Sequence, residues 1–321
     1  MSGKTRILLT GAAGYIGAAI GTDLEAAGYE VVGVTRRGMA SAPESAEQPA
    51  AGSMPNAKST PESGSASPES LRSGYRSRFQ VRCDLSDAVA TRRALAEIPA
   101  CDVIVHTASR TDSARDAIAA STAMLRNLFD ATRHWDARWI HLSSVAVYGD
   151  DRRNGPVSVD ADLRPATNYG RAKLACERFL RQCQLPDCRI LRITPVYSPN
   201  ALRNLAVRVY LPGTPLRMKI RPEPRHSLCA LDRLIARVRN HVEDARVRIW
   251  IENTADPVPH GQHELARRFD RGPLIPISER IFRLIYVALA LIPGGAGYQL
   301  RCVYWKLFRS NVYETPGQAL D

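Results

Sequence analysis

A short apolar run followed by three closely spaced glycines constrains the fold of this chain more than any other feature. The run is Arg6–Thr10, and an amphipathic stretch from Tyr15 to Ala27 follows it, with Gly28 as a helix stop. The glycines between and within these segments are Gly11, Gly14 and Gly17. A buried strand, a glycine turn and a helix in this order predict the start of a βαβ unit, in which the helix N-terminus faces the phosphates of a dinucleotide.

Strands and helices alternate regularly through the first two thirds of the chain. Further strands are predicted at residues 30–34, 79–83, 102–106, 138–142 and 188–193, and further helices at 88–98, 117–132 and 169–182. This alternation predicts an α/β Rossmann fold, a doubly wound parallel sheet, over residues 1–194. From residue 195 Pro, Gly and Arg are frequent, and isolated helices are expected at 232–242 and 279–292. We therefore expect residues 195–321 to form a smaller, irregular substrate-binding cap over the carboxyl edge of the sheet.

Residues 38–78 interrupt this pattern after the second predicted strand. Ser, Pro, Ala, Glu and Gly dominate the segment, which has almost no large apolar residue. Such a composition cannot bury enough apolar surface to offset the entropy of ordering. We expect a disordered surface insertion and favour a neutral role over a regulatory one.

Charge and cysteine content limit the partners that are expected. The net charge of +12 suits anionic partners, but no Lys/Arg run is long enough for a nucleic-acid-binding arm, so we expect no nucleic-acid partner. Seven cysteines without a CxxC pair indicate reduced thiols in a cytoplasmic protein with no metal site, and we expect His260 and His263 to lie in a surface turn. The apolar segment 281–292 is shorter than the roughly 20 residues that span a bilayer. We favour a core or interface helix there over a helix with weak membrane-surface contact.

The end of the second strand bears on the choice of cofactor. An NAD site usually has a carboxylate at this position for the ribose hydroxyls, whereas this chain has Thr35, Arg36 and Arg37. Guanidinium groups form charge-assisted bonds to a 2′-phosphate. The sequence therefore favours NADP over NAD, with NAD as the alternative.

Tyr169 and Lys173 are four residues apart on a predicted helix and so share a face. A phenol with a reference pKa of about 10 is a poor acid–base catalyst at neutral pH, and a neighbouring ammonium stabilises its phenolate form. We expect Lys173 to activate Tyr169 in this way for proton transfer. Ser144 is expected to hydrogen-bond the substrate oxygen on which charge develops.

These stretches resemble the extended short-chain dehydrogenase/reductase family, the NAD-dependent epimerase/dehydratase group. The resemblance rests on Thr10–Gly17, Ser143–Gly149 and Pro165–Glu177, with Tyr169 25 residues after Ser144. It implies adenine contacts from Asp84 and Leu85, a loop under the cofactor at residues 106–109, and a phosphate contact from Arg225. The expected cofactor-binding residues are Gly11, Gly14, Tyr15, Ile16, Gly17, Thr35, Arg36, Arg37, Asp84, Leu85, Thr107, Ala108, Ser109, Tyr169 and Lys173. The expected catalytic residues are Ser144, Tyr169 and Lys173, and the expected substrate-binding residues are Ser144, Asn204 and Arg225.

Four positions depart from the family pattern and bear on the substrate. They are Ser121 and Pro195 in place of Asn, Ser198 in place of Gly, and Cys229 in place of His. The resemblance implies an NADP-dependent oxidoreductase that reduces or epimerises a keto group of a nucleotide-linked sugar. The alternatives are a reductase of a small or lipid-like ketone, an NAD-dependent sugar 4-epimerase, and a cofactor-sensing protein without turnover. We expect a homodimer.

Overall fold

The structure, a computed structural model, describes residues 4–36, 77, 79–110, 116–149, 155–211, 214–280, 283–284, 307–315 and 318–319. The insertion predicted at 38–78 lies outside these residues, except for Ser77. The apolar segment 281–292 also lies outside them, except for residues 283 and 284.

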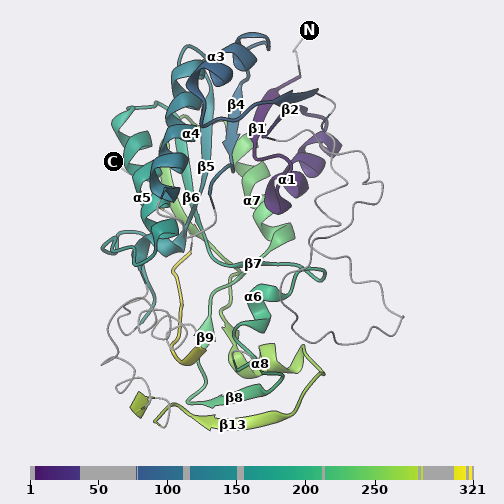
Figure 1. The fold of residues 1–321 in the computed structure, drawn as a ribbon, viewed down its shortest axis with the longest axis vertical. Coiled ribbons are helices and arrows are strands. Elements are labelled where there is room, and N and C mark those ends of the chain that lie inside the picture. Colours follow the sequence, from purple (N-terminus) through teal and green to yellow (C-terminus); the bar gives the residue numbers. More distant parts are fainter. Residues whose placement is uncertain are drawn as a thin grey trace, which may run out of the picture.

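The centre of the molecule is an eight-stranded sheet with the order β14-β11-β6-β5-β4-β1-β2-β3 (Figure 1). Its strands are β1 (Arg6–Thr10), β2 (Glu30–Thr35), β3 (Phe79–Arg82), β4 (Val103–His106), β5 (Arg138–Ser144), β6 (Cys188–Ile193), β11 (Ile249–Thr254) and β14 (Gln318–Ala319). Seven strands run parallel and β14 runs antiparallel to β11. The predicted Rossmann sheet is confirmed, and each of its six predicted strands forms close to its expected ends.

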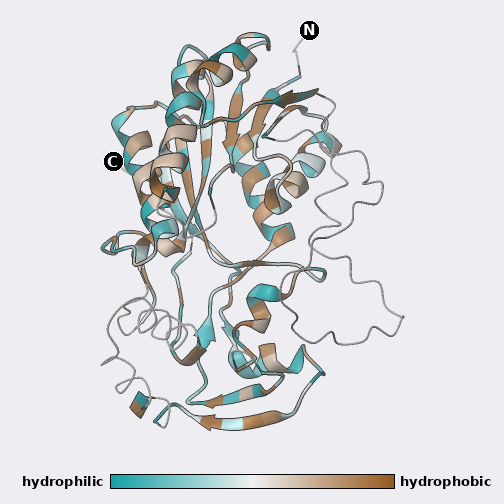
Figure 2. Ribbon diagram, viewed as in Figure 1, coloured by the Kyte–Doolittle hydropathy of each residue, from teal (hydrophilic) through white to brown (hydrophobic). Residues whose placement is uncertain are grey.

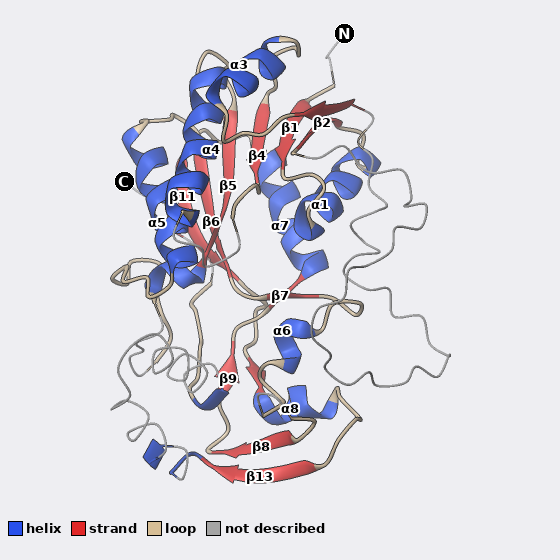
Figure 3. Cartoon of the chain, in the orientation of Figure 1, coloured by secondary structure: helices blue, strands red, loops and turns tan. Residues whose placement is uncertain are grey.

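Helices cover both faces of this sheet (Figure 3). One face carries α1 (Tyr15–Ala26) and α7 (Leu231–Glu243), and the other carries α3 (Ala88–Ala96), α4 (Ala117–Thr132) and α5 (Asn168–Gln182). Strand β1 shows why both faces are covered, because Ile7 and Leu9 pack with the first group while Leu8 packs with the second. The strands are accordingly largely hydrophobic in Figure 2, as expected for a parallel sheet buried on both faces.

Local signals fix where the helices begin and end. The Asp87 side chain accepts hydrogen bonds from the N–H groups of Val89 and Ala90 at the start of α3. The Thr167 hydroxyl accepts one from Gly170 at the start of α5. Such caps contribute about 1 kcal/mol each, so the sequence places these helix starts locally.

The predicted domain boundary at residue 194 assigns two elements to the cap that the structure places on the sheet. Strand β11 pairs with β6 along its whole length, and α7 packs beside α1. The sequence does not predict β11 as a strand because it carries Glu252 and Asn253, and such residues are rare in strands. The Rossmann unit therefore includes residues 231–254, which follow the first cap elements in the sequence.

The cap lies beyond the carboxyl ends of the parallel strands (Figure 1). Its elements are β7 (Val196–Tyr197), α6 (Arg203–Ala206), β8 (Arg217–Arg221), β9 (Arg225–His226), β10 (Cys229–Ala230), β12 (His260–Gly261), α8 (Gln262–Arg267) and β13 (Leu274–Ser278). They form the two-stranded pairs β10–β7, β12–β9 and β13–β8 around small apolar clusters. No helix among the described residues is long and apolar enough to span a bilayer.

Candidate active site

The loop between β1 and α1 is shaped by its glycines. Gly11 has a φ of +70°, a conformation that side chains rarely adopt, and Gly14 donates its N–H to the Gly11 carbonyl at 2.9 Å. A Cβ at Gly17 would overlap the same carbonyl, so the helix can pack this closely only without a side chain there. Gly14 caps α1 without any side-chain bond, which leaves the first N–H groups of the helix for a ligand. The loop, including Tyr15 and Ile16 in the first turn, fits the phosphates of a dinucleotide.

The loop after β4 is fastened to this glycine loop. The Thr107 hydroxyl donates to the Thr10 carbonyl at 2.7 Å, and the Ala108 N–H donates to the Thr10 hydroxyl at 3.3 Å. The Ser109 hydroxyl donates to the Arg110 carbonyl, and the Arg110 N–H donates to the hydroxyl of Ser121 on α4. Ser121 therefore anchors this loop in place of the Asn of the family pattern.

The residues expected to bind the adenosine part of the cofactor differ in how exposed they are. Thr35 is buried and Arg36 is exposed, while Arg37 lies outside the described residues. The hydroxyl and N–H of Ser86, with a smaller contribution from Arg36, hold the pKa of Asp84 below its usual value. Leu85 is 4% exposed and packs in the core cluster with residues of α4, and its contact with the adenine stays a prediction.

Helix α5 and strand β5 bring the expected catalytic residues to one place. Lys173 is 4% exposed, and its Nζ donates to the Leu142 carbonyl at 2.7 Å, two residues before Ser144 on the same strand. Half-buried Tyr169 lies one helical turn before Lys173 on α5. Its neighbour Gly170 packs so tightly on the Ala146 carbonyl that a Cβ there would overlap it. The start of α5 is thus pressed against the 3₁₀ turn Val145–Tyr148 that follows Ser144.

A network of buried hydrogen bonds and an ion pair fixes the position of α5 relative to the sheet. The Ser143 hydroxyl donates to Glu177 on α5 at 2.5 Å, and Glu177 pairs with Arg192 on β6 at 2.8 Å. Arg192 also donates to the hydroxyl of Tyr148 at 2.9 Å. Because these groups are almost fully buried and all are paired, they fix α5 relative to β5 and β6.

Two histidines lie side by side in the sheet near Lys173. His106 and His141 are register partners on β4 and β5, and their rings stack with centroids 5.3 Å apart. Burial, and secondarily the charge of Lys173, lowers the pKa of His106 to about 3 and lowers that of His141 strongly. The His106 ring hydrogen-bonds the Thr10 hydroxyl, whereas neither nitrogen of His141 has a partner among the described residues.

The expected substrate residues in the cap are engaged with the protein itself. The Asn204 amide donates to the Val196 carbonyl at 2.6 Å, and the exposed Arg225 donates to the Pro259 carbonyl at 2.9 Å. The sequence did not reveal a hydrogen bond of 2.7 Å from the Tyr15 hydroxyl to Ser198, which links the cofactor helix to the segment after β7.

The expected surface turn at His260 is wrong. This histidine lies in β12, is 12% exposed at its side chain, and its Nε2 lies 2.9 Å from Asp256 Oδ2. The bond to Asp256 raises the pKa of His260 above its usual value. Asp256 also accepts a hydrogen bond from the Tyr197 hydroxyl at 2.9 Å. His260 and Asp256 are therefore part of a hydrogen-bond network within the cap.

The sequence model of the NAD dependent epimerase/dehydratase family matches residues 7–212. The chain belongs to this family. The recognition of the extended short-chain dehydrogenase/reductase group from its motifs is thereby confirmed.

The individual proteins to which this epimerase/dehydratase family member is similar match only part of its length or share little of its sequence. The chain is 35% identical over 122 residues to a dTDP-4-dehydrorhamnose reductase of Mycolicibacterium smegmatis, a match that spans 36% of either chain. The UDP-glucuronic acid 4-epimerase of Bacillus cereus, solved with NAD, has a TM-score of 0.61 and 20% identity over 94% of this chain and 99% of its own. The dTDP-4-dehydrorhamnose reductase of Bacillus anthracis, solved with NADP, has a TM-score of 0.58 and 14% identity over 87% and 86%. These structures share the fold.

Proposed function

We propose that this family member is an NADP-dependent oxidoreductase that reduces the keto group of a nucleotide-linked sugar. The observation that carries the proposal is the buried Lys173, whose Nζ lies on the Leu142 carbonyl beside Ser144 and one helical turn from Tyr169. The curated relative named dTDP-4-dehydrorhamnose reductase supports this substrate class. A cytoplasmic location and a homodimer stay predictions from the sequence.

The roles of the three side chains follow from their chemistry. The loop from Gly11 to Gly17 would hold NADPH, which would supply a hydride when bound. Tyr169 donates a proton to the carbonyl oxygen, and the ammonium of Lys173 stabilises the phenolate that results. The Ser144 Oγ accepts from the Ala146 N–H at 3.2 Å, so its own O–H remains to donate to the oxygen that gains charge.

The preference for NADP rests on the end of β2. Thr35 and Arg36 take the place where an NAD site usually carries a carboxylate, and Arg36 is exposed. Its guanidinium can donate a charge-assisted bond to a 2′-phosphate. A cofactor that binds as NADPH and dissociates after the reaction suits a net reduction of the substrate.

A panel of nucleotide-linked 4-keto sugars, monitored through NADPH absorbance, tests the activity. The Tyr169→Phe variant should lose about 10²- to 10⁴-fold in kcat while it still binds NADPH, because only the proton donor is removed. Tyr29→Phe is the matched control, since Tyr29 lies at the opposite, amino end of the sheet beside Glu30 of β2. Full turnover by Tyr169→Phe would refute the assigned role. Co-purification of NAD that NADPH does not displace would point to an epimerase instead.

A further inference from the structure

A hydrogen bond between two hydroxyl groups joins the glycine loop to the cap. The Tyr15 hydroxyl donates to the Ser198 Oγ at 2.7 Å, across 183 residues of sequence. Tyr15 is the first residue of α1, and Ser198 follows β7 at the start of the cap. Ser198 stands where the family pattern has a glycine, which has no side chain to accept this bond. The link therefore depends on a residue in which this chain departs from the family pattern.

Other contacts hold both ends of this link. The Tyr15 ring packs against the core cluster that contains Val196 of β7 and Leu231 of α7. The backbone at Ser198 forms a turn, because the Ala201 N–H donates to the Ser198 carbonyl at 3.0 Å. Among the described residues, neither hydroxyl has another hydrogen-bond partner. A change at either hydroxyl therefore removes the link without removing a second hydrogen bond.

The backbone at Tyr15 belongs to the part of the glycine loop that a dinucleotide would order. Gly14 caps α1 without a side-chain bond, which leaves the first N–H groups of the helix for phosphate oxygens. A phosphate on these N–H groups would hold the first helical turn, from which the Tyr15 side chain projects. Since the Tyr15 hydroxyl is bonded to Ser198, the gain in order would extend to the cap. Ligands that rigidify one region in this way lower the cost of ordering the next.

We propose that Ser198 is a positioning residue that acts through Tyr15. It couples occupancy of the dinucleotide site to the order of the cap segment 195–204, which includes the expected substrate residue Asn204. The Asn204 amide donates to the Val196 carbonyl at 2.6 Å, so the two ends of this segment are tied together. The coupling rests on dinucleotide binding and not on the reduction proposed for this family member.

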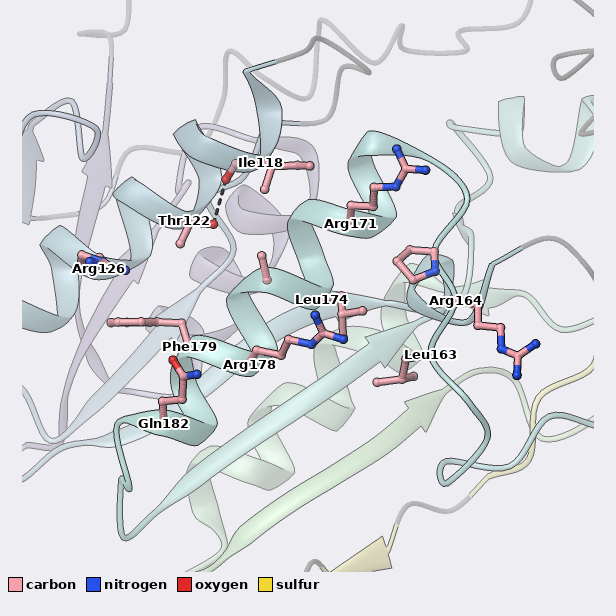
Figure 4. A pocket seen from close by; sticks show the side chains of 12 residues that line it. Ile118, Thr122, Arg126, Leu163, Arg164, Arg171, Leu174, Arg178, Phe179 and Gln182 are labelled. Atoms are coloured by element: carbon pink, nitrogen blue, oxygen red, sulfur yellow. Dashed lines mark hydrogen bonds between the residues drawn. The ribbon is translucent and has the colours of Figure 1, made fainter. Parts of the chain in front are cut away.

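The link lies on the face of the sheet that α1 and α7 cover, because Tyr15 packs with that core cluster. The hollow lined by residues of α4 and α5 belongs to the opposite face (Figure 4). Substitutions at Tyr15 and Ser198 therefore leave the contacts of α4 and α5 intact. A change that they cause reports on the cofactor loop and the cap.

Hydrogen–deuterium exchange of the full-length protein tests the coupling, with and without a saturating dinucleotide. The dinucleotide is NADPH or NAD, whichever binds the wild type more tightly in a calorimetric titration. In the wild type it should slow exchange of the backbone amides of 195–204 about fivefold, or about 1 kcal/mol, as expected for one neutral hydrogen bond. Ser198→Ala and Tyr15→Phe should each reduce this slowing to below about twofold.

Two further variants separate the hydrogen bond from the bulk of the side chains. The double variant of Ser198→Ala and Tyr15→Phe should lose no more of the slowing than either single variant, since both remove the same bond. Ser198→Thr should restore the slowing, because threonine keeps the hydroxyl. Additive losses, or a Ser198→Thr variant that behaves like Ser198→Ala, would contradict a role for the hydroxyl.

Tyr197→Phe is the matched control, because the neighbouring Tyr197 hydroxyl donates to Asp256 within the cap and not to α1. It should leave the slowing by the dinucleotide intact. Absence of slowing in the wild type, or its persistence in Ser198→Ala, overturns the coupling. Equal loss in Tyr197→Phe also overturns it, since it shows a general loosening of the cap. No turnover is measured, so a failed reductase assay leaves this result unaffected.

Discussion

Acidification should destabilise this protein through its neutral buried histidines. The folded-state pKa of His106 is about 3, and that of His141 is also strongly lowered, while an unfolded histidine titrates near 6.5. Between these values the unfolded chain binds the proton and the folded chain does not, so stability falls as the pH falls below about 6.5. Each such histidine costs about 1.4 kcal/mol per pH unit, or about 2 kcal/mol at pH 5.

The His141→Leu variant isolates one of these contributions. Because neither ring nitrogen of His141 has a partner in the part of the chain that the structure describes, its removal should leave the free energy of unfolding at pH 7 unchanged or higher. Urea unfolding at pH 7, 6 and 5 should then show the variant gaining about 2 kcal/mol over the wild type between pH 7 and 5. His134→Leu replaces an exposed histidine and should give a profile parallel to the wild type. Parallel profiles for His141→Leu as well would refute the reasoning.

Three further changes test other parts of the structure. Gly17→Ala should abolish NADPH binding in a fluorescence titration, because its Cβ would overlap the Gly11 carbonyl; intact affinity would mean that the loop can open. Arg36→Asp should raise the KM for NADPH about 10- to 100-fold relative to NADH, as expected for one or two lost charge-assisted bonds, and an unchanged ratio in steady-state assays would remove Arg36 from the cofactor choice. Glu177→Gln should cost about 3–5 kcal/mol in urea unfolding because Arg192 keeps a buried charge without its partner, and a loss below about 1 kcal/mol would contradict this.

The sheet strands and the glycine loop could be predicted because their signals are local. Arg6–Thr10 is a continuous apolar run, and the glycine spacing after it permits few backbone paths. Tyr169 and Lys173 were likewise placed by helix periodicity alone. In each case the residues that decide the structure are neighbours in the sequence.

The misplaced features depend on partners that are distant in the sequence. Strand β11 was missed because Glu252 is stabilised there by Arg237, 15 residues away. His260 is held by Asp256, four residues before it, and Asp256 in turn accepts a hydrogen bond from Tyr197, 59 residues away. The side-chain bond from Asn204 to Val196 and the bond from Tyr15 to Ser198 also have no local signature.

The return of the chain to β11 bears on how this protein can be divided for expression. A fragment that ends at residue 194 would leave β6 as an unpaired edge strand, with six backbone register positions open to other chains. All residues of Cys188–Ile193 are buried in the intact protein, and four of the six are apolar, so truncation would expose a largely apolar edge. Bare apolar edges promote aggregation between molecules. The smallest soluble unit should therefore extend through Thr254.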